Sequence, residues 1–160
     1  MDIQTTLSKT NAVGNLFLRL ALAGVILPHG AQLLLGSFNG PGFTNAMSYF
    51  VEVEGLPSLV GFMVIFLQFF GSLFILFGFA TRFMALGMAG LFVGMIVTSH
   101  LQYGFFMNWY GTQKGEGYEY HLLVIGMAMS LVLTGAGRLS LDALITRKLI
   151  PEHKIAYKRM

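Results

Sequence analysis

Four long apolar runs limit most strongly what this chain can fold into. Each run approaches the roughly 20 residues that an α-helix needs to cross the hydrocarbon core of a membrane. A soluble domain would also need a polar surface, yet only 11% of the 160 residues are charged, against roughly 25% in soluble domains. The sequence therefore predicts an all-α integral membrane protein, a bundle of four transmembrane helices. The predicted spans are residues 15–35, 56–79, 83–103 and 118–136.

The links between the runs predict how the helices follow one another. A Gly- and Pro-rich stretch follows the first run, and we expect a short interfacial helix within it near residues 45–53. Only "ATR" joins the second and third runs, which predicts a tight antiparallel hairpin. Residues 1–145 are expected to form a single four-helix membrane domain. Residues 146–160 are expected to form a basic cytoplasmic tail that lies on an anionic leaflet.

The distribution of lysine and arginine predicts the orientation in the membrane. Positively charged loops stay in the cytoplasm during insertion, and nine Lys and Arg residues fall on one side of a four-span arrangement, against Lys114 on the other. Both termini are therefore expected to be cytoplasmic. A cleaved signal peptide is the alternative for the first run, but the run is too long and lacks a convincing cleavage site. The nine residues are Lys9, Arg19, Arg82, Arg138, Arg147, Lys148, Lys154, Lys158 and Arg159.

Composition also excludes several kinds of reactive site and partner. The chain has no cysteine, which excludes disulfides, thiolate metal sites and cysteine nucleophiles, so redox chemistry would need a bound cofactor or a partner. The net charge of +3 does not indicate a nucleic-acid partner. The basic residues gather on one side of the membrane rather than in a patch flanked by aromatic residues.

Polar residues within the runs are the candidate functional residues. Ionisable groups in a membrane are costly, and they face the bundle interior or a wet cavity. Pro28 is expected to bend the first helix at the level of these groups and to free a carbonyl. In a regular helix the side chains of Glu119 and His121 point about 200° apart, so both cannot face one centre. The candidates are His29, His100, Glu119 and His121 near the outer ends of their helices, with Gln68 nearer the middle.

The histidines allow three interpretations. A metal site would favour a spacing such as HxxxH or ExxH, which is missing, so no metal is expected. The histidines can instead bond to backbone carbonyls or lie at the membrane interface. They can also handle protons or bind a ligand. A quinone is the natural ligand, because its carbonyls accept hydrogen bonds from His, Gln or Tyr and its ring suits Phe and Met walls.

Arg19 has a simpler interpretation. It lies close to the cytoplasmic end of the first run. We therefore expect its side chain to reach toward the membrane surface and to pair with a carboxylate such as Asp142.

Several stretches of the chain resemble one known family. "RLALAGVILPHGAQLLLG" followed by "FNGPGF" resembles the first helix and loop of the DoxX-like family of bacterial membrane proteins, and "FGFATRFMALGM" resembles their second hairpin. "GYEYHLLVIGMAMSLVLTGAGRLSLDALI" resembles their last helix. The resemblance runs from about Gly14 to Ile145, and it implies a four-helix bundle in the bacterial inner membrane.

The resemblance also implies functional positions and partners. Members of the family include a small membrane subunit of an archaeal thiosulfate:quinone oxidoreductase and a partner in a mycobacterial redox-protecting complex, with a eukaryotic secretory cargo receptor more distant. Gln32 stands where lysine is common and Gln68 where an acidic residue is common, which argues against a strict proton relay or ion pair. The family's recurrent polar positions are matched by Arg19, His29, Gly30, Glu119, Arg138 and Asp142.

Two functions remain as hypotheses. The first is a quinone-associated subunit of a membrane redox complex, with a non-covalent quinone held by His29, Gln68, Glu119, His100 and His121 and with electrons supplied by a partner protein. The second is a non-enzymatic scaffold or assembly protein that binds other proteins or further copies of itself. A small transporter is disfavoured because four spans are few and no inverted repeat is apparent. Structural or interface roles are expected for Arg19, Pro28, Gly30, Arg138 and Asp142.

The two hypotheses differ in what the outer polar residues do. A pocket lined by them favours the quinone-binding subunit. Polar residues that bond only to one another favour the scaffold.

Overall fold

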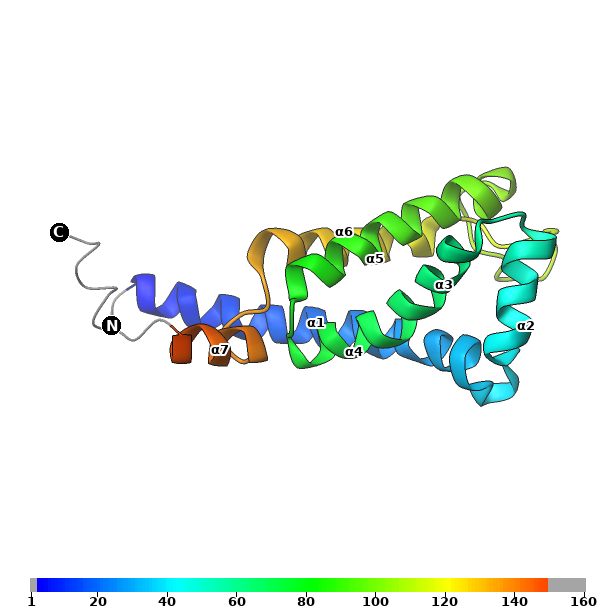
Figure 1. Ribbon diagram of the computed structural model, residues 1–160. Helices are drawn as coiled ribbons and strands as arrows, with labels where there is room; N and C mark the ends of the chain where they lie inside the picture. Colours follow the sequence, from blue (N-terminus) through cyan, green and yellow to red (C-terminus); the bar gives the residue numbers. More distant parts are fainter. Residues whose placement is uncertain (1–2, 150–160) are drawn as a thin grey trace.

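The computed structural model describes residues 3–149, and its helices follow the four apolar runs as four rods (Figure 1). Within these residues there is no strand, and the predicted all-α bundle of four helices is confirmed. The rods are α1 (Ile3–Leu35); α3 (Ser58–Phe66) with the π-helical turn η3 (Leu67–Gly71) and α4 (Ser72–Phe77); α5 (Thr81–Met95) with the π-helical turn η4 (Ile96–His100) and the 3-10 turn η5 (Leu101–Tyr103); and α6 (Glu119–Thr134).

Shorter elements connect the rods. The helix expected near residues 45–53 is present as α2 (Gly42–Ser48) and the π-helical turn η2 (Tyr49–Val53), after the short turn η1 (Ser37–Asn39). α2 runs across the end of the bundle that lies away from the chain termini, which we call the loop end (Figure 1). α7 (Leu141–Leu149) lies at the opposite end, the terminal end. From residue 150 onward, the predicted basic tail lies outside the described residues.

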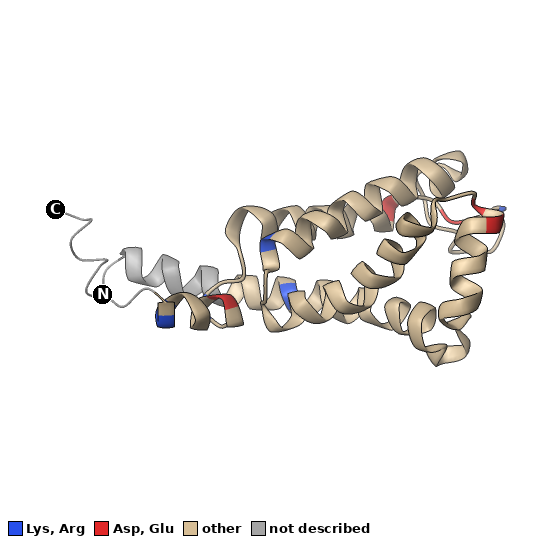
Figure 2. Ribbon diagram, viewed as in Figure 1, with Lys and Arg blue, Asp and Glu red and all other residues tan. Residues whose placement is uncertain are grey.

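The surface of the bundle suits lipid. Three rods are long and apolar enough to cross a membrane, over Val13–Leu35, Ser58–Phe77 and Thr81–Tyr103. α6 is shorter: at 1.5 Å per residue its 16 residues reach about 24 Å, against roughly 30 Å for the hydrocarbon core. Charged positions gather toward the two ends (Figure 2). Large apolar side chains such as Phe83, which is 74% exposed, cover the outside, as an environment of lipid tails allows.

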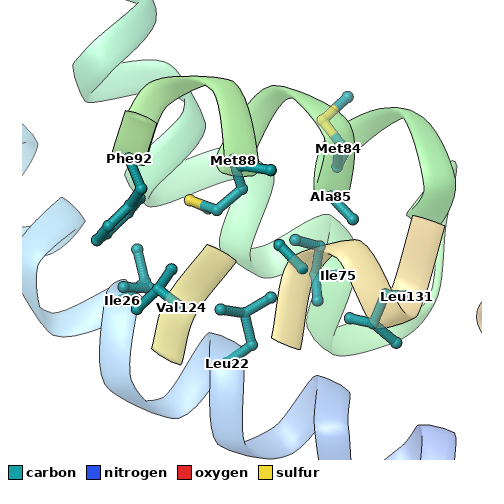
Figure 3. Close-up of a cluster of buried hydrophobic side chains, with 11 residues drawn as sticks. Leu22, Ile26, Ile75, Met84, Ala85, Met88, Phe92, Val124 and Leu131 are labelled. Carbon is teal, nitrogen blue, oxygen red and sulfur yellow. The ribbon is translucent and has the colours of Figure 1, made fainter. Parts of the chain in front are cut away.

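The core lies where α1, α4, α5 and α6 meet. α5 packs along α6, and α1 packs on α4 and on η3. Leu22 and Ile26 of α1 lie among Ile75, Met88 and Val124 from the other three helices (Figure 3). Between membrane helices, such contacts stabilise the bundle by van der Waals packing, because lipid tails are as apolar as the side chains. The core therefore fixes the rods that carry the polar residues described below.

The predicted hairpin between the second and third rods is also present. Gly78 ends α4 in the left-handed conformation (φ 70°), and α5 begins at Thr81. Ala80 is left-handed as well (φ 47°), which is costly for a residue with a Cβ atom. The Asp142 carboxylate holds this turn, since it accepts hydrogen bonds from the amides of Ala80 (2.8 Å) and Thr81 (3.0 Å). The Asp142 amide in turn donates to the Gly78 carbonyl (2.8 Å).

Arg19 turns into the protein, so the expected reach toward the membrane surface is wrong. Its side chain is 2% exposed, and Nη1 donates to the carbonyl of Ala136 over 2.9 Å. Asn15, one turn earlier on α1, donates to the carbonyl of Gly135 over 3.1 Å. Gly135 and Ala136 follow the last residue of α6, so their carbonyls have no helical partner, and these two side chains satisfy them. Arg19 and Asp142 thus each bond to backbone groups at the terminal end, while Arg138 is exposed.

Candidate functional site

A pocket of about 490 Å³ lies at the loop end of the bundle. Its volume falls within the roughly 300–1,000 Å³ typical of small-molecule sites. Three of the predicted ligand-binding residues line it from three different rods: His29 of α1, Gln68 of η3 and His100 of η4. Two of the four polar residues predicted at the outer ends of the helices, His29 and His100, thus line a pocket.

The three π-helical turns within residues 3–149 all contribute side chains to this pocket. Tyr49 and Phe50 come from η2, Gln68 from η3, and Ser99 and His100 from η4. A π turn holds one residue more than an α-helical turn, and it occurs frequently at functional sites. The departures from regular helix geometry therefore coincide with the pocket wall.

Close contact between α1 and η3 sets the position of Gln68. A Cβ atom at Gly30 would lie 2.5 Å from the backbone carbonyl of Gln68 and from the amide nitrogen of Phe69. Only glycine permits so close an approach between two backbones. Gln68 itself is 5% exposed, and its side chain lines the pocket. Gly30 therefore lets η3 lie directly on α1. Pro28 lies within the continuous helix α1, and its predicted bend stays a prediction.

Glu54 is a pocket residue that the sequence analysis missed. Its Oε1 accepts a hydrogen bond from the Tyr49 hydroxyl (2.5 Å), and its Oε2 accepts one from the Ser99 hydroxyl (3.3 Å). All three residues line the pocket. The bond to the Glu54 carboxylate raises the pKa of Tyr49 above its ordinary value of 10. α-Helical spacing does not show the pair, since it is the π turn η2 that brings together residues five apart, as Tyr49 and Glu54 are.

His121 lies against His100 rather than in the pocket wall. The two rings have centroids 4.1 Å apart, and His121 is 3% exposed. Nδ1 of His100 lies 2.9 Å from the carbonyl oxygen of Glu116, so this nitrogen donates. Nδ1 of His121 is buried and has no hydrogen-bond partner among the described residues. His121 therefore contacts the ring of His100 from behind the pocket wall without bonding to it.

Glu119 lies in a different hollow. It lines a second pocket of about 480 Å³ with apolar walls, and it accepts a hydrogen bond from the indole nitrogen of Trp109 over 3.0 Å. The structure therefore separates Glu119 from His121, as their positions on a regular helix predict. Of the five predicted ligand-binding residues, three line the first pocket, one lies against it and one lies elsewhere.

The first pocket also has apolar lining residues, Leu33, Phe50, Leu56, Val64 and Met95, and further polar ones, Gln32, Thr98, Gln102 and Tyr103. Within the described part of the chain, no group of three His, Cys, Asp or Glu side chains could hold a metal ion. The pocket thus combines apolar surface with hydrogen-bonding groups, as small-molecule sites do.

Comparisons with known proteins agree with this architecture. The sequence model of the DoxX family matches residues 14–101, more than half of the chain. "Putative oxidoreductase CatD" of Bacillus subtilis is 27% identical over 139 residues, which cover 87% of this chain and 92% of that protein. "Inner membrane protein YqjF" of Escherichia coli is 34% identical over 107 residues, which cover 67% of this chain and 77% of that protein. No solved structure matches the chain. With four helical rods, three of them long enough to span a membrane, and with this match, the chain belongs to the DoxX family.

Proposed function

We propose that this DoxX family protein binds a quinone head group in the pocket at the loop end and serves as the quinone-associated subunit of a membrane redox complex. The observation that carries the proposal is the pocket itself. It has the volume of a small-molecule site, apolar walls and hydrogen-bonding groups from three rods. A pure scaffold has no need of such a pocket.

The polar groups suit the two oxygens of a quinone. The Gln68 amide can donate or accept, and each nitrogen of a neutral imidazole such as that of His29 does one or the other. Phe50 and Met95 supply the apolar surface that a quinone ring needs. Electrons would come from a partner protein, because the chain has no cysteine with which to carry them. The name of the Bacillus subtilis relative adds support for redox chemistry.

Binding of a short-chain quinone to the protein purified in mild detergent tests the proposal. Menadione is expected to bind with a stoichiometry of one per chain in equilibrium dialysis. Gln68→Leu and His29→Ala are each expected to weaken binding about tenfold, because each removes one hydrogen bond to a quinone oxygen. Glu119→Gln is the matched control, since Glu119 lies in the other hollow. An unchanged affinity in both pocket variants, or no binding by the parent protein, would overturn the proposal.

We also propose that the protein lies in the bacterial inner membrane with both termini in the cytoplasm. The excess of Lys and Arg at the terminal end supports this orientation, and the name of the Escherichia coli relative supports the membrane. With this orientation the pocket lies near the outer leaflet.

The cysteine-free chain allows a direct test of the orientation. Lys114→Cys is expected to react with a membrane-impermeant maleimide in intact spheroplasts, because residue 114 lies between α5 and α6 at the loop end. Lys148→Cys in α7 is expected to react only after the membrane is permeabilised. The opposite pattern would contradict the proposed orientation, and the parent chain gives the background labelling.

A further inference from the structure

In one wall of the pocket, each hydroxyl group already donates its hydrogen to a neighbouring group of the protein. Tyr49 donates to Oε1 of Glu54 (2.5 Å) and Ser99 donates to Oε2 (3.3 Å). Thr98, which lines the same wall, donates to the backbone carbonyl of Gly94 over 3.0 Å. A hydroxyl has one hydrogen and two lone pairs, and a carboxylate has only lone pairs. The wall formed by η2 and η4 therefore presents acceptors to whatever occupies the pocket.

His100 adds to this pattern. Its Nδ1 donates to the carbonyl of Glu116 over 2.9 Å. In a neutral imidazole the other nitrogen is then an acceptor. Together with Glu54, the wall offers several acceptors from two neighbouring π-helical turns and the residue that follows η2.

The other polar residues that line the pocket do not discriminate between donors and acceptors. Gln32, Gln68 and Gln102 carry amides that have both, and His29 can take either tautomer. Tyr103 also lines the pocket, and its hydroxyl can donate or accept. Whether the pocket prefers a donor or an acceptor therefore depends on the ligand group that lies next to the Glu54 carboxylate.

We infer that the pocket prefers a hydroxyl-bearing aromatic head group, a quinol, over the corresponding quinone, with Glu54 as the specificity-determining residue. The inference rests on the proposed function and deepens it, since it names the redox form that the site holds. A quinol hydroxyl donates to the acceptor wall. A quinone carbonyl next to Glu54 has only lone pairs, so neither the carbonyl nor the carboxylate would gain a hydrogen bond there.

The two redox forms are expected to differ measurably in their affinity for the pocket. Because a hydrogen bond to a charged acceptor is among the stronger ones, we expect menadiol to bind at least tenfold more tightly than menadione. For a two-electron couple a tenfold preference for the reduced form raises the potential of the bound couple by about 30 mV. Both quantities can be measured on the same preparation under anaerobic conditions, by equilibrium dialysis and by redox titration.

Glu54→Gln is the variant that tests the role of the carboxylate. The amide of glutamine adds a donor at the acceptor wall, so the preference for menadiol is expected to fall to about twofold or to reverse. Glu52→Gln is the matched control, because Glu52 is an exposed residue of η2 that does not line the pocket. The Glu52→Gln variant is expected to prefer menadiol over menadione by the same factor as the parent protein.

The results separate this inference from the function on which it rests. If neither form binds the parent protein, the proposed function fails and the preference fails with it. If menadione binds as tightly as menadiol, the quinone site stands and the preference is overturned. If Glu52→Gln lowers the preference as much as Glu54→Gln, the role of Glu54 is overturned. The comparison of the two forms on the parent protein needs no variant, so the test does not depend on whether Glu54→Gln folds.

Discussion

Gly30→Ala is expected to lower the free energy of unfolding by about 3 kcal/mol, at the upper end of what an overpacked interior costs. The new methyl group would meet the backbone of Gln68 and Phe69 at 2.5 Å. Backbone atoms cannot turn aside as a flexible side chain can, so α1 and η3 would have to separate. Denaturation in mixed detergent micelles, followed by circular dichroism, measures the loss.

The same helix provides the control for this substitution. Gly24 has nothing within 4 Å of the position that a Cβ atom would take. Gly24→Ala is therefore expected to leave stability unchanged or to raise it slightly, since alanine is the better helix former. Gly30→Ala should also weaken menadione binding, because Gln68 moves with η3. Equal stabilities of the two variants would show that the close contact of α1 with η3 is not needed.

Asp142→Asn is expected to lower the free energy of unfolding by about 2 kcal/mol, the cost of leaving a buried donor without its partner. The carboxylate accepts from both the Ala80 and the Thr81 amides. Asparagine keeps one acceptor and turns an NH2 group toward the other amide, where two donors meet. The left-handed Ala80 (φ 47°) then loses a bond that holds its conformation.

Lys148→Gln is the control for Asp142→Asn, because Lys148 is an exposed residue of the same helix α7. It is expected to change stability by less than about 0.5 kcal/mol, as surface substitutions usually do. Thermal unfolding in detergent compares the two variants with the parent protein. A stability of Asp142→Asn equal to that of Lys148→Gln would contradict the role given to the carboxylate.

Hydropathy and charge predict the helices of this protein well because lipid imposes a simple rule. A helix that crosses a membrane must satisfy its own backbone and present apolar side chains over its whole length. The four runs meet that rule, and the tight "ATR" link leaves the second and third helices no alternative to a hairpin. The environment of Arg19 follows no such rule, since its partner is a backbone carbonyl of Ala136, more than 100 residues away in the chain.

The candidate site is predictable only in part, for a geometric reason. His29, Gln68 and His100 stand out because a polar residue is rare within an apolar run. Glu54 and Tyr49 lie between the runs, where polar residues are ordinary. In a regular α-helix, residues five apart point about 140° from each other, so α-helical spacing hides the pair. Only the π turn η2 brings them together.

Each π turn holds one residue more than an α-helical ladder needs. A family member one residue shorter at 67–71 would keep its apolar character, yet its helix beyond that point would be rotated by about 100° relative to this one. The side of the helix that carries Gln68 would then no longer match the face that packs on α1. We therefore expect single-residue insertions, which neither composition nor hydropathy registers, to change which side chains reach the pocket. In an alignment of the family, members with a one-residue gap at 67–71 or 96–100 are expected to lack the polar side chains that line this pocket.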